Sequence, residues 1–236
     1  MATILHIETS SQVCSVSVSK NGNVAAIKES TDKNSHAELV TIFSEEVLKE
    51  TGKAFSDLDA IAVSMGPGSY TGLRIGVSTA KGFCFAIDKP LIAISTLEAM
   101  ACGMVKFAKK SGFIHKNHLF CPMIDARRME VYTAVFDSEL KTIQEISAEI
   151  IDETSFAELL EKHPILFAGD GAEKCKDLFS SEKNAHFLDD FNPSSAFMAE
   201  LAEKKFNAGN FENLAYFEPF YLKDFVSGIP KVKGLR

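Results

Sequence analysis

This sequence of 236 residues lacks a long apolar run, a basic excess and any CxxC pair, and each absence excludes a class of protein. No apolar stretch approaches the ~20 residues of a membrane-spanning helix, and the chain opens without the basic and apolar regions of a signal peptide. The five scattered cysteines indicate reduced thiols rather than a zinc site. The net charge of −7 argues against tight direct binding to nucleic acid. We therefore expect a cytoplasmic protein with no membrane segment, and the charge leaves open RNA reached through a partner.

What the chain does contain is one segment of unusual composition, GPGSYTGLRIG, which runs from Gly66 to Gly76. It follows an apolar run typical of a strand and opens a pattern that predicts a helix over 69–87, with Ser69 as its N-cap. A strand, a glycine turn and a helix can present backbone amides to an anion, so a phosphate cradle is one interpretation. The spacing matches neither the dinucleotide fingerprint nor the P-loop.

Small residues recur every four positions within this helix, at Gly72, Gly76 and Ala80, and so lie on one helix face. Because glycine costs roughly 1 kcal/mol relative to alanine in a helix interior, something is expected to pack closely against this face. The neighbour is either the protein's own sheet or helix, or a helix of another subunit.

The rest of the chain predicts strands and helices in an order that occurs twice. Residues 3–27 favour a three-stranded meander, because small and apolar side chains alternate and Asn21-Gly22 is typical of a tight hairpin. In the rest of the first half, periodicity predicts helices at 35–50 and 96–105 and strands at 61–64 and 91–94. In the second half it predicts strands at 119–124, 131–135, 142–151 and 165–168, a short helix at 156–160 and a last helix at 194–207.

Two copies of strand–strand–strand–helix–strand–helix–strand resemble the actin-like ATPase fold, also called the ASKHA or ribonuclease H-like fold. The fold class is therefore predicted as α/β, with two lobes of duplicated βββαβαβ order. We expect an N-terminal lobe with partner-binding helices over 1–112, a smaller C-terminal lobe over 113–212 and a tail over 213–236. The last helix, 194–207, is expected to pack back toward the N-terminal lobe.

The cleft between such lobes normally holds a nucleotide, whose phosphates lie between two hairpin tips of small and hydroxyl residues. The first tip, ETSSQ, keeps such residues, whereas the second, DARRME, has two arginines where glycine would be needed. These arginines either bind phosphate directly or pair with Glu8 or Asp125 and fill the cleft, and Glu8 itself is expected to be a polar turn residue. We expect weak or absent ATP hydrolysis, no cofactor, and a vestigial cleft formed by Glu8, Thr9, Ser10, Ser11, Asp125, Arg127, Arg128, Gly169 and Gly171.

Five stretches in order resemble the TsaB (YeaZ) family: ILHIETSSQVCSVSVS, GPGSYTGLRIGVSTAKGF, ISTLEAMA, MIDARRMEVYTAVF and EPFYLKD. The resemblance implies a subunit of the machinery for threonylcarbamoyladenosine in tRNA, related to the TsaD (Kae, Gcp) "glycoprotease" family. In TsaD a helix carries an HxxxH metal site. The matching positions here hold Thr96 and Met100, which implies that this chain has no catalytic residues and no metal.

The resemblance also implies a role and partners. The chain would be a non-catalytic scaffold that binds and activates TsaD, with TsaE in a ternary complex, for N6-threonylcarbamoylation of adenosine 37 in tRNAs reading ANN codons. It would touch tRNA only through that complex, and it would form a homodimer when isolated. Helices 35–50 and 69–87 would form the partner interface, with the candidate residues His36, Leu39, Phe43, Thr71, Gly72, Leu73, Arg74, Gly76, Val77 and Ala80.

Two other functions stay open. A stand-alone actin-like ATPase or kinase is favoured by Glu8, Asp125 and the Gly169-Asp170-Gly171 turn, and opposed by the DARRME tip. A glycoprotease-like peptidase is suggested only by the label given to relatives, since the sequence has no HExxH and no convincing Ser–His–Asp or Cys–His set.

Overall fold

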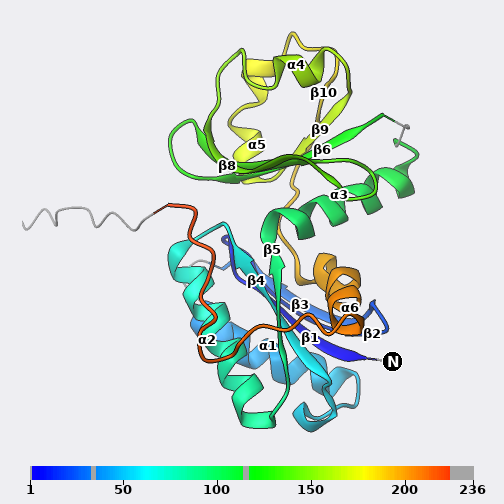
Figure 1. Ribbon diagram of the computed structural model, residues 1–236, viewed down its shortest axis with the longest axis vertical. Coiled ribbons are helices and arrows are strands. Elements are labelled where there is room, and N and C mark those ends of the chain that lie inside the picture. Colours follow the sequence, from blue (N-terminus) through cyan, green and yellow to red (C-terminus); the bar gives the residue numbers. More distant parts are fainter. Residues whose placement is uncertain (1, 33–35, 114–116, 224–236) are drawn as a thin grey trace, which may run out of the picture.

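The computed structural model describes residues 2–32, 36–113 and 117–223, which form two five-stranded sheets (Figure 1). The first sheet has the strand order β3-β2-β1-β4-β5, and the second has β10-β9-β6-β7-β8. In each sheet the first strand of its half lies at the centre, antiparallel to the second strand and parallel to the fourth. The predicted duplication of the βββαβαβ order is confirmed.

The first sheet contains β1 (Thr3–Glu8), β2 (Cys14–Lys20), β3 (Asn23–Ser30), β4 (Ala60–Gly66) and β5 (Leu91–Ser95). The second contains β6 (Leu119–Asp125), β7 (Glu130–Phe136), β8 (Thr142–Ile150), β9 (Ile165–Ala168) and β10 (Ala185–Leu188). The α-helices are α1 (His36–Glu50), α2 (Tyr70–Ile87), α3 (Thr96–Ser111), α4 (Ala157–Leu160), α5 (Asp170–Glu173) and α6 (Ala199–Asn207). Short 3-10 helices lie at η1 (Phe55–Asp57), η2 (Lys176–Phe179) and η3 (Ser195–Met198).

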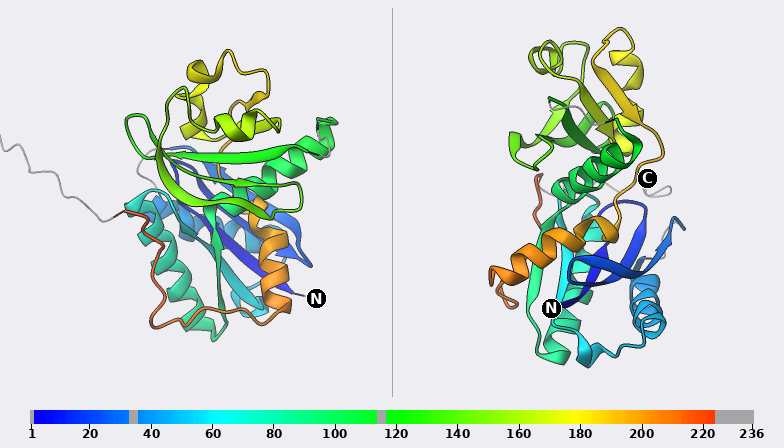
Figure 2. Two further views of the ribbon diagram at one scale, coloured as in Figure 1. Left: turned by 45° about the horizontal axis from the view of Figure 1, so that its top comes forward. Right: turned by 90° about the vertical axis from the view of Figure 1, so that its right-hand side faces the viewer.

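Alternation along β1 assigns different helices to the two faces of the first sheet. Leu5 and Ile7 point to one face, where they share a core with residues of α1 and α2 such as Val47 and Val77. Ile4 points to the opposite face, where the core includes residues of α3 and α6. This is the period of two that a strand buried on both faces requires. Figure 2 shows α1 and α2 on one side of the sheet and α6 on the other.

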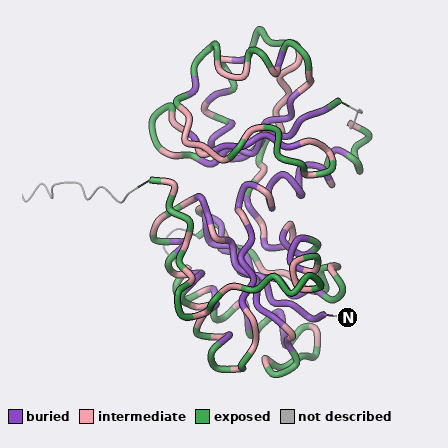
Figure 3. The backbone as a smooth tube through the Cα atoms, in the orientation of Figure 1, coloured by how far each residue is buried: buried purple, intermediate pink, exposed green. Residues whose placement is uncertain are grey.

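Helix α3 lies between the two sheets and joins the lobes. Its Ala99 and Cys102 belong to the core of the first sheet, whereas Met100 and Met104 pack against residues of the second. Most of α3 is therefore buried (Figure 3). The helix is predicted to end at residue 105 but continues to Ser111, where Gly112 adopts the left-handed C-cap conformation, with φ 71°.

The sequence-based prediction gives no bounds for β10, α5 and η1, although the repeated order implies a helix and a strand after the Gly169-Asp170-Gly171 turn. The last predicted helix, 194–207, begins instead as η3, and regular α-helix starts at Ala199. Helix α6 contacts β5 and β1 of the first sheet. The predicted lobe boundaries at residues 112 and 212 stay predictions, and residues 224–236 of the predicted tail lie outside the described residues. No helix in the described ranges is long and apolar enough to span a membrane.

Candidate functional site

The glycine stripe of α2 packs against the protein's own first hairpin tip. A Cβ on Gly72 would lie 2.0 Å from the carbonyl oxygen of Thr9, and one on Gly76 would lie 2.3 Å from Thr9 Oγ1. The Thr9 hydroxyl donates a hydrogen bond of 2.8 Å to the carbonyl of Gly72. Ala80 is fully buried in the same core. Of the two interpretations of the stripe, the neighbour within the same molecule is therefore correct.

This packing corrects half of the predicted partner interface. Five of the ten predicted positions are buried, namely Gly72, Leu73, Gly76, Val77 and Ala80. They face the sheet and are enclosed by the chain's own β1 and β4, so they are not available on the surface. Of the other predicted positions, Thr71 and Arg74 are exposed, whereas His36, Leu39 and Phe43 are half-buried.

Ser69 is the N-cap of α2, as the sequence predicts. Its side chain accepts a hydrogen bond of 3.2 Å from the backbone amide of Gly72. The backbone amide of Ser69 in turn donates to the carbonyl of Ser10, at 2.7 Å. The N-terminus of α2 is thereby fixed to the first hairpin tip.

Glu8 is fully buried at the end of β1, so the expectation of a polar turn residue is wrong. Its Oε1 accepts hydrogen bonds from the amide of Ser10, at 2.6 Å, and from the hydroxyl of Ser64, at 3.0 Å. Burial raises the pKa of Glu8, and these hydrogen bonds oppose the shift only in part. Thr9 and Ser10 are buried beside it, and Ser11 is half-buried at the cleft.

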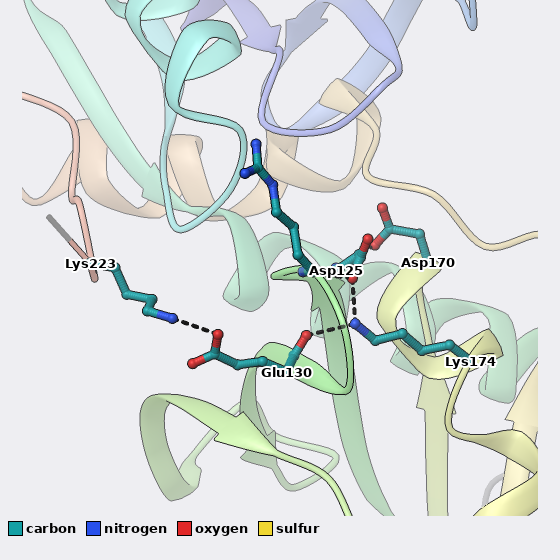
Figure 4. A network of polar contacts seen from close by, with 6 residues as sticks. Asp125, Glu130, Asp170, Lys174 and Lys223 are labelled. Atoms are coloured by element: carbon teal, nitrogen blue, oxygen red, sulfur yellow. Dashed lines mark hydrogen bonds and ion pairs between the residues drawn. The ribbon is translucent and has the colours of Figure 1, made fainter. Parts of the chain in front are cut away.

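The second hairpin tip is held by a lysine that the sequence analysis missed. Lys174 forms an ion pair with Asp125 and donates to the carbonyl of Glu130, at 2.6 Å (Figure 4). Asp170 accepts a bond of 2.9 Å from the amide of Asp125, and burial raises the pKa of Asp170. No local pattern indicates this ion pair, because Lys174 lies 49 residues after Asp125 in the chain.

Among the described residues, neither tip arginine pairs through its side chain with Glu8 or Asp125, so the expected pairing is wrong. Arg127 and Arg128 both have positive φ, 76° and 52°, because the chain reverses direction at these residues. The backbone amide of Arg127 donates to Asp125 Oδ1, at 2.9 Å, and both arginine side chains are exposed. The carboxylate of Asp125 is therefore paired with Lys174, at the end of α5, and not with an arginine.

The two predicted glycines of the second lobe, Gly169 and Gly171, allow close packing of the backbone. A Cβ on Gly169, whose φ is 107°, would lie 2.1 Å from the carbonyl oxygen of Met123. A Cβ on Gly171 would lie 2.9 Å from the carbonyl carbon of Ile124. Both glycines allow the turn from β9 into α5 to lie against β6.

A cleft of about 970 Å³ separates the hairpin tips of the two lobes. Of the nine residues predicted to form it, Ser10, Ser11, Asp125 and Arg127 line it, and the other five do not. The C-terminal residues 220–223 form part of its wall, together with Tyr132 and Asp170. With Asp125 bound to Lys174, the cleft wall offers hydroxyls, the side chains of Arg127 and Lys223, and the carboxyl of Asp170.

A second concave surface lies between α1 and α2 on the outside of the molecule. This α1–α2 groove measures about 460 Å³ and is lined by Ala37, Tyr70, Thr71, Arg74, Ile75, Ser78 and Thr79. Arg74 lies over the ring of Tyr70, with 5.4 Å between its guanidinium carbon and the ring centroid. Beyond the groove, Ile42 of α1 is 40% exposed and Phe85 of α2 is 82% exposed.

The outward face of α2 carries its own small residues, at Thr71, Ser78 and Gly82, followed by the large side chain of Phe85. A Cβ on Gly82 would meet no atom within 4 Å. Ser78, Gly82 and Phe85 are exposed and were not among the predicted interface residues. The signal was present in the sequence as a second stripe of small residues, offset around the helix from the predicted one.

Two sheets of the same strand order, with hairpin tips facing a common cleft, define a protein of the actin-like ATPase fold. The family model described as "TsaD: tRNA N6-adenosine threonylcarbamoyltransferase" matches residues 25–231. The chain is 31% identical over 170 residues to the tRNA threonylcarbamoyladenosine biosynthesis protein TsaB of Bacillus subtilis, with 71% of this chain and 70% of that protein covered. The chain therefore belongs to the family of that model and to the TsaB (YeaZ) family.

Other relatives match most of the length of the chain. The TsaB protein of Haemophilus influenzae is 28% identical over 234 residues, which cover 95% of each chain. The YeaZ structure from Pseudomonas aeruginosa superimposes with a TM-score of 0.74 at 22% identity, over 94% of this chain and 100% of that one. A second Pseudomonas aeruginosa structure, described as similar to peptidase YEAZ, gives a TM-score of 0.79 at 24% identity over the same shares.

Proposed function

We propose that this protein is a non-catalytic subunit in the biosynthesis of threonylcarbamoyladenosine in tRNA, and that it binds and activates a TsaD-type transferase. Involvement in the pathway is supported by its relatives, which are named as biosynthesis proteins for this modification. The finer role is supported above all by one observation, the exposed outer face of α2 with its small residues and its solvent-exposed Phe85.

This face has the features of a helix-docking surface. Small side chains at Ser78 and Gly82 allow another helix to approach closely, and the α1–α2 groove beside them can accept its ridge of side chains. Phe85, which is 82% exposed, adds a large apolar side chain to this face, and apolar patches on a protein surface often mark interaction sites. Because TsaD resembles this chain, the proposed occupant is the corresponding helix pair of TsaD, and a second copy of this chain takes its place when the subunit is isolated.

The non-catalytic part of the proposal is supported by the two positions that match the HxxxH metal motif of TsaD. Thr96 and Met100 are both fully buried, and Met100 packs among apolar residues of the second sheet. The ion pair between Lys174 and Asp125 also occupies the carboxylate of the second hairpin tip. The contribution to the reaction would then be a shift of TsaD toward its active conformation, because a partner that binds only that conformation increases its population.

In the full assembly, TsaE would join the pair and the cytoplasmic complex would modify N6 of adenosine 37 in tRNAs reading ANN codons. The test is reconstitution of the modification from TsaD and TsaE with and without this chain. We expect the rate to fall when the chain is left out. An unchanged rate would refute the proposed role.

The docking face is tested separately by co-elution with TsaD in size-exclusion chromatography. Ser78→Arg introduces a long charged side chain into the α1–α2 groove and is expected to abolish co-elution. Ser181→Arg is the matched control, because Ser181 is also exposed but lies in the other lobe. If both variants remain folded and co-elute equally well, TsaD does not bind this face.

The cleft favours a second candidate, a stand-alone actin-like ATPase or kinase. Its volume of about 970 Å³ lies within the range of small-molecule sites. Calorimetry of the purified chain with ATP and Mg²⁺ distinguishes the two candidates. Tight binding would favour the enzyme, whereas the absence of measurable heat would favour the scaffold.

A further inference from the structure

The C-terminal segment from Phe211 to Lys223, here called the strap, is attached to the first lobe along most of its length. The amide of Glu212 donates to the carbonyl of Leu91 at the edge of β5, at 2.9 Å. Lys81 of α2 donates to the carbonyl of Phe217, at 3.0 Å. Leu214 and Phe217 also pack against the core beneath α2. These contacts anchor residues 211–217.

The strap then passes over the glycine turn that precedes α2. The amide of Phe220 donates to the carbonyl of Met65, at 2.7 Å. A Cβ on Gly66 would lie 2.6 Å from the carbonyl oxygen of Phe220, and the φ of Gly66 is 114°. The strap can therefore lie this close only because Gly66, the first glycine of the GPGSYTGLRIG segment, has no side chain.

The last part of the strap crosses from the first lobe to the second. The ring of Tyr221 lies 4.8 Å, between centroids, from the ring of Tyr70 at the start of α2. Lys223 forms an ion pair of 2.5 Å with Glu130 of β7, and Figure 4 shows it reaching Glu130 from the side opposite Lys174. Residues 220–223 also form part of the cleft wall. The strap thus closes one side of the cleft and fastens to both lobes.

We infer that residues 220–223 are a releasable lid on the cleft between the lobes. The two parts of the strap differ in how they are held. Residues 211–217 are held by core packing and Phe220 by a backbone hydrogen bond, whereas Lys223 at the far end is held by an ion pair in contact with water, with 46% of Lys223 and 20% of Glu130 exposed. An exposed ion pair contributes little to stability and is weakened by salt. The lid therefore opens at Lys223 while the strap stays attached along α2.

Hydrogen exchange of the whole folded chain tests the lid. Lys223→Met is expected to raise exchange two- to fivefold in the cleft-lining tips, residues 10–12 and 125–127, which is the range that an exposed ion pair supports. Lys28→Met is the matched control, because Lys28 also forms exposed ion pairs, with Glu46 and Glu50. The control is expected to leave exchange at both tips unchanged.

Two further variants test the same contact. Glu130→Gln is expected to reproduce the effect of Lys223→Met, and the double variant to add nothing, because both remove the same contact. A chain that ends after Glu218 lacks the lid but keeps residues 211–217, so its tips should exchange about tenfold faster while β1 and β4 stay protected. Unchanged exchange in the shortened chain, or additive effects of the two substitutions, would overturn the inference.

Discussion

Gly76 lies directly beneath Thr9, close enough that a Cβ on the glycine would come within 2.3 Å of the threonine hydroxyl. The same hydroxyl donates to the carbonyl of Gly72, one helical turn away. Helix α2 is therefore fixed to the tip of the first hairpin through its own backbone. Its opposite face stays open to solvent.

Substitution of Gly76 by alanine is expected to lower the free energy of unfolding by about 1–3 kcal/mol. Alanine gains helix propensity, but the added methyl group collides with Thr9, and such overpacking outweighs the gain. Urea denaturation monitored by circular dichroism measures the change.

Gly82→Ala is the matched control on the same helix. It adds the same methyl group where no atom lies within 4 Å, so it is expected to raise stability by about 0.5–1 kcal/mol. Equal effects of the two substitutions would show that the contact with Thr9 does not limit the packing of α2.

His6 is expected to destabilise the fold as the pH falls. Burial lowers its pKa from 6.5 to about 3, and its Nε2 lies 2.7 Å from Ser19 Oγ. Between these two pKa values the unfolded chain binds a proton that the folded chain does not, so stability decreases by up to about 1.4 kcal/mol per pH unit on acidification. Unfolding curves of the native chain and of His6→Gln between pH 7 and 4 measure this, and parallel profiles would contradict it.

Glu8, two residues further along β1, is expected to act in the opposite direction. Its folded-state pKa is raised above 4.5, so its stabilising contribution is complete below that pH and is lost as the pH rises through the folded-state value. Glu8→Gln should therefore increase stability at neutral pH, and its advantage should shrink as the pH approaches 4.5. Thermal unfolding at pH 7.5 and pH 4.5 provides the comparison. A Glu8→Gln variant that is less stable at pH 7.5 would indicate that the carboxylate is needed in its charged form.

Lys174→Met is expected to lower stability by about 1–2 kcal/mol, because it leaves the carbonyl of Glu130 and the carboxylate of Asp125 without their charged donor. Lys176→Met is the control, because its ion pair with Asp189 is about half exposed on both sides. We expect that substitution to change stability by less than about 0.5 kcal/mol. Comparable losses in both variants would mean that Lys174 forms no more than a surface ion pair.

Much of the fold was determined by local sequence patterns. Asn21-Gly22 set the first hairpin, since both residues have positive φ as a tight primed turn requires, and Ser69 set the start of α2. The alternation of small and apolar side chains likewise predicted the meander of β1, β2 and β3. The bounds of short elements such as β10 escaped prediction because four residues of intermediate burial carry no clear period.

The candidate site depended more on tertiary structure. The small residues of α2 form two stripes, one at Gly72 and Gly76 and one at Ser78 and Gly82, and spacing alone does not tell which of them meets the sheet. Contact with Thr9, which lies more than sixty residues earlier in the chain, decided it. For the same reason, the sequence could not predict that Asp125 pairs with Lys174 rather than with an arginine.

The sequence by itself determined the family, the duplicated order of elements and the caps and turns, because these depend on neighbours within a few residues. Only the tertiary structure decided which helix face stays exposed, which charges meet across the cleft and how the strap closes it. Those outcomes depend on pairs of residues far apart in the chain, whose distances are set by the packing of the two sheets around α3.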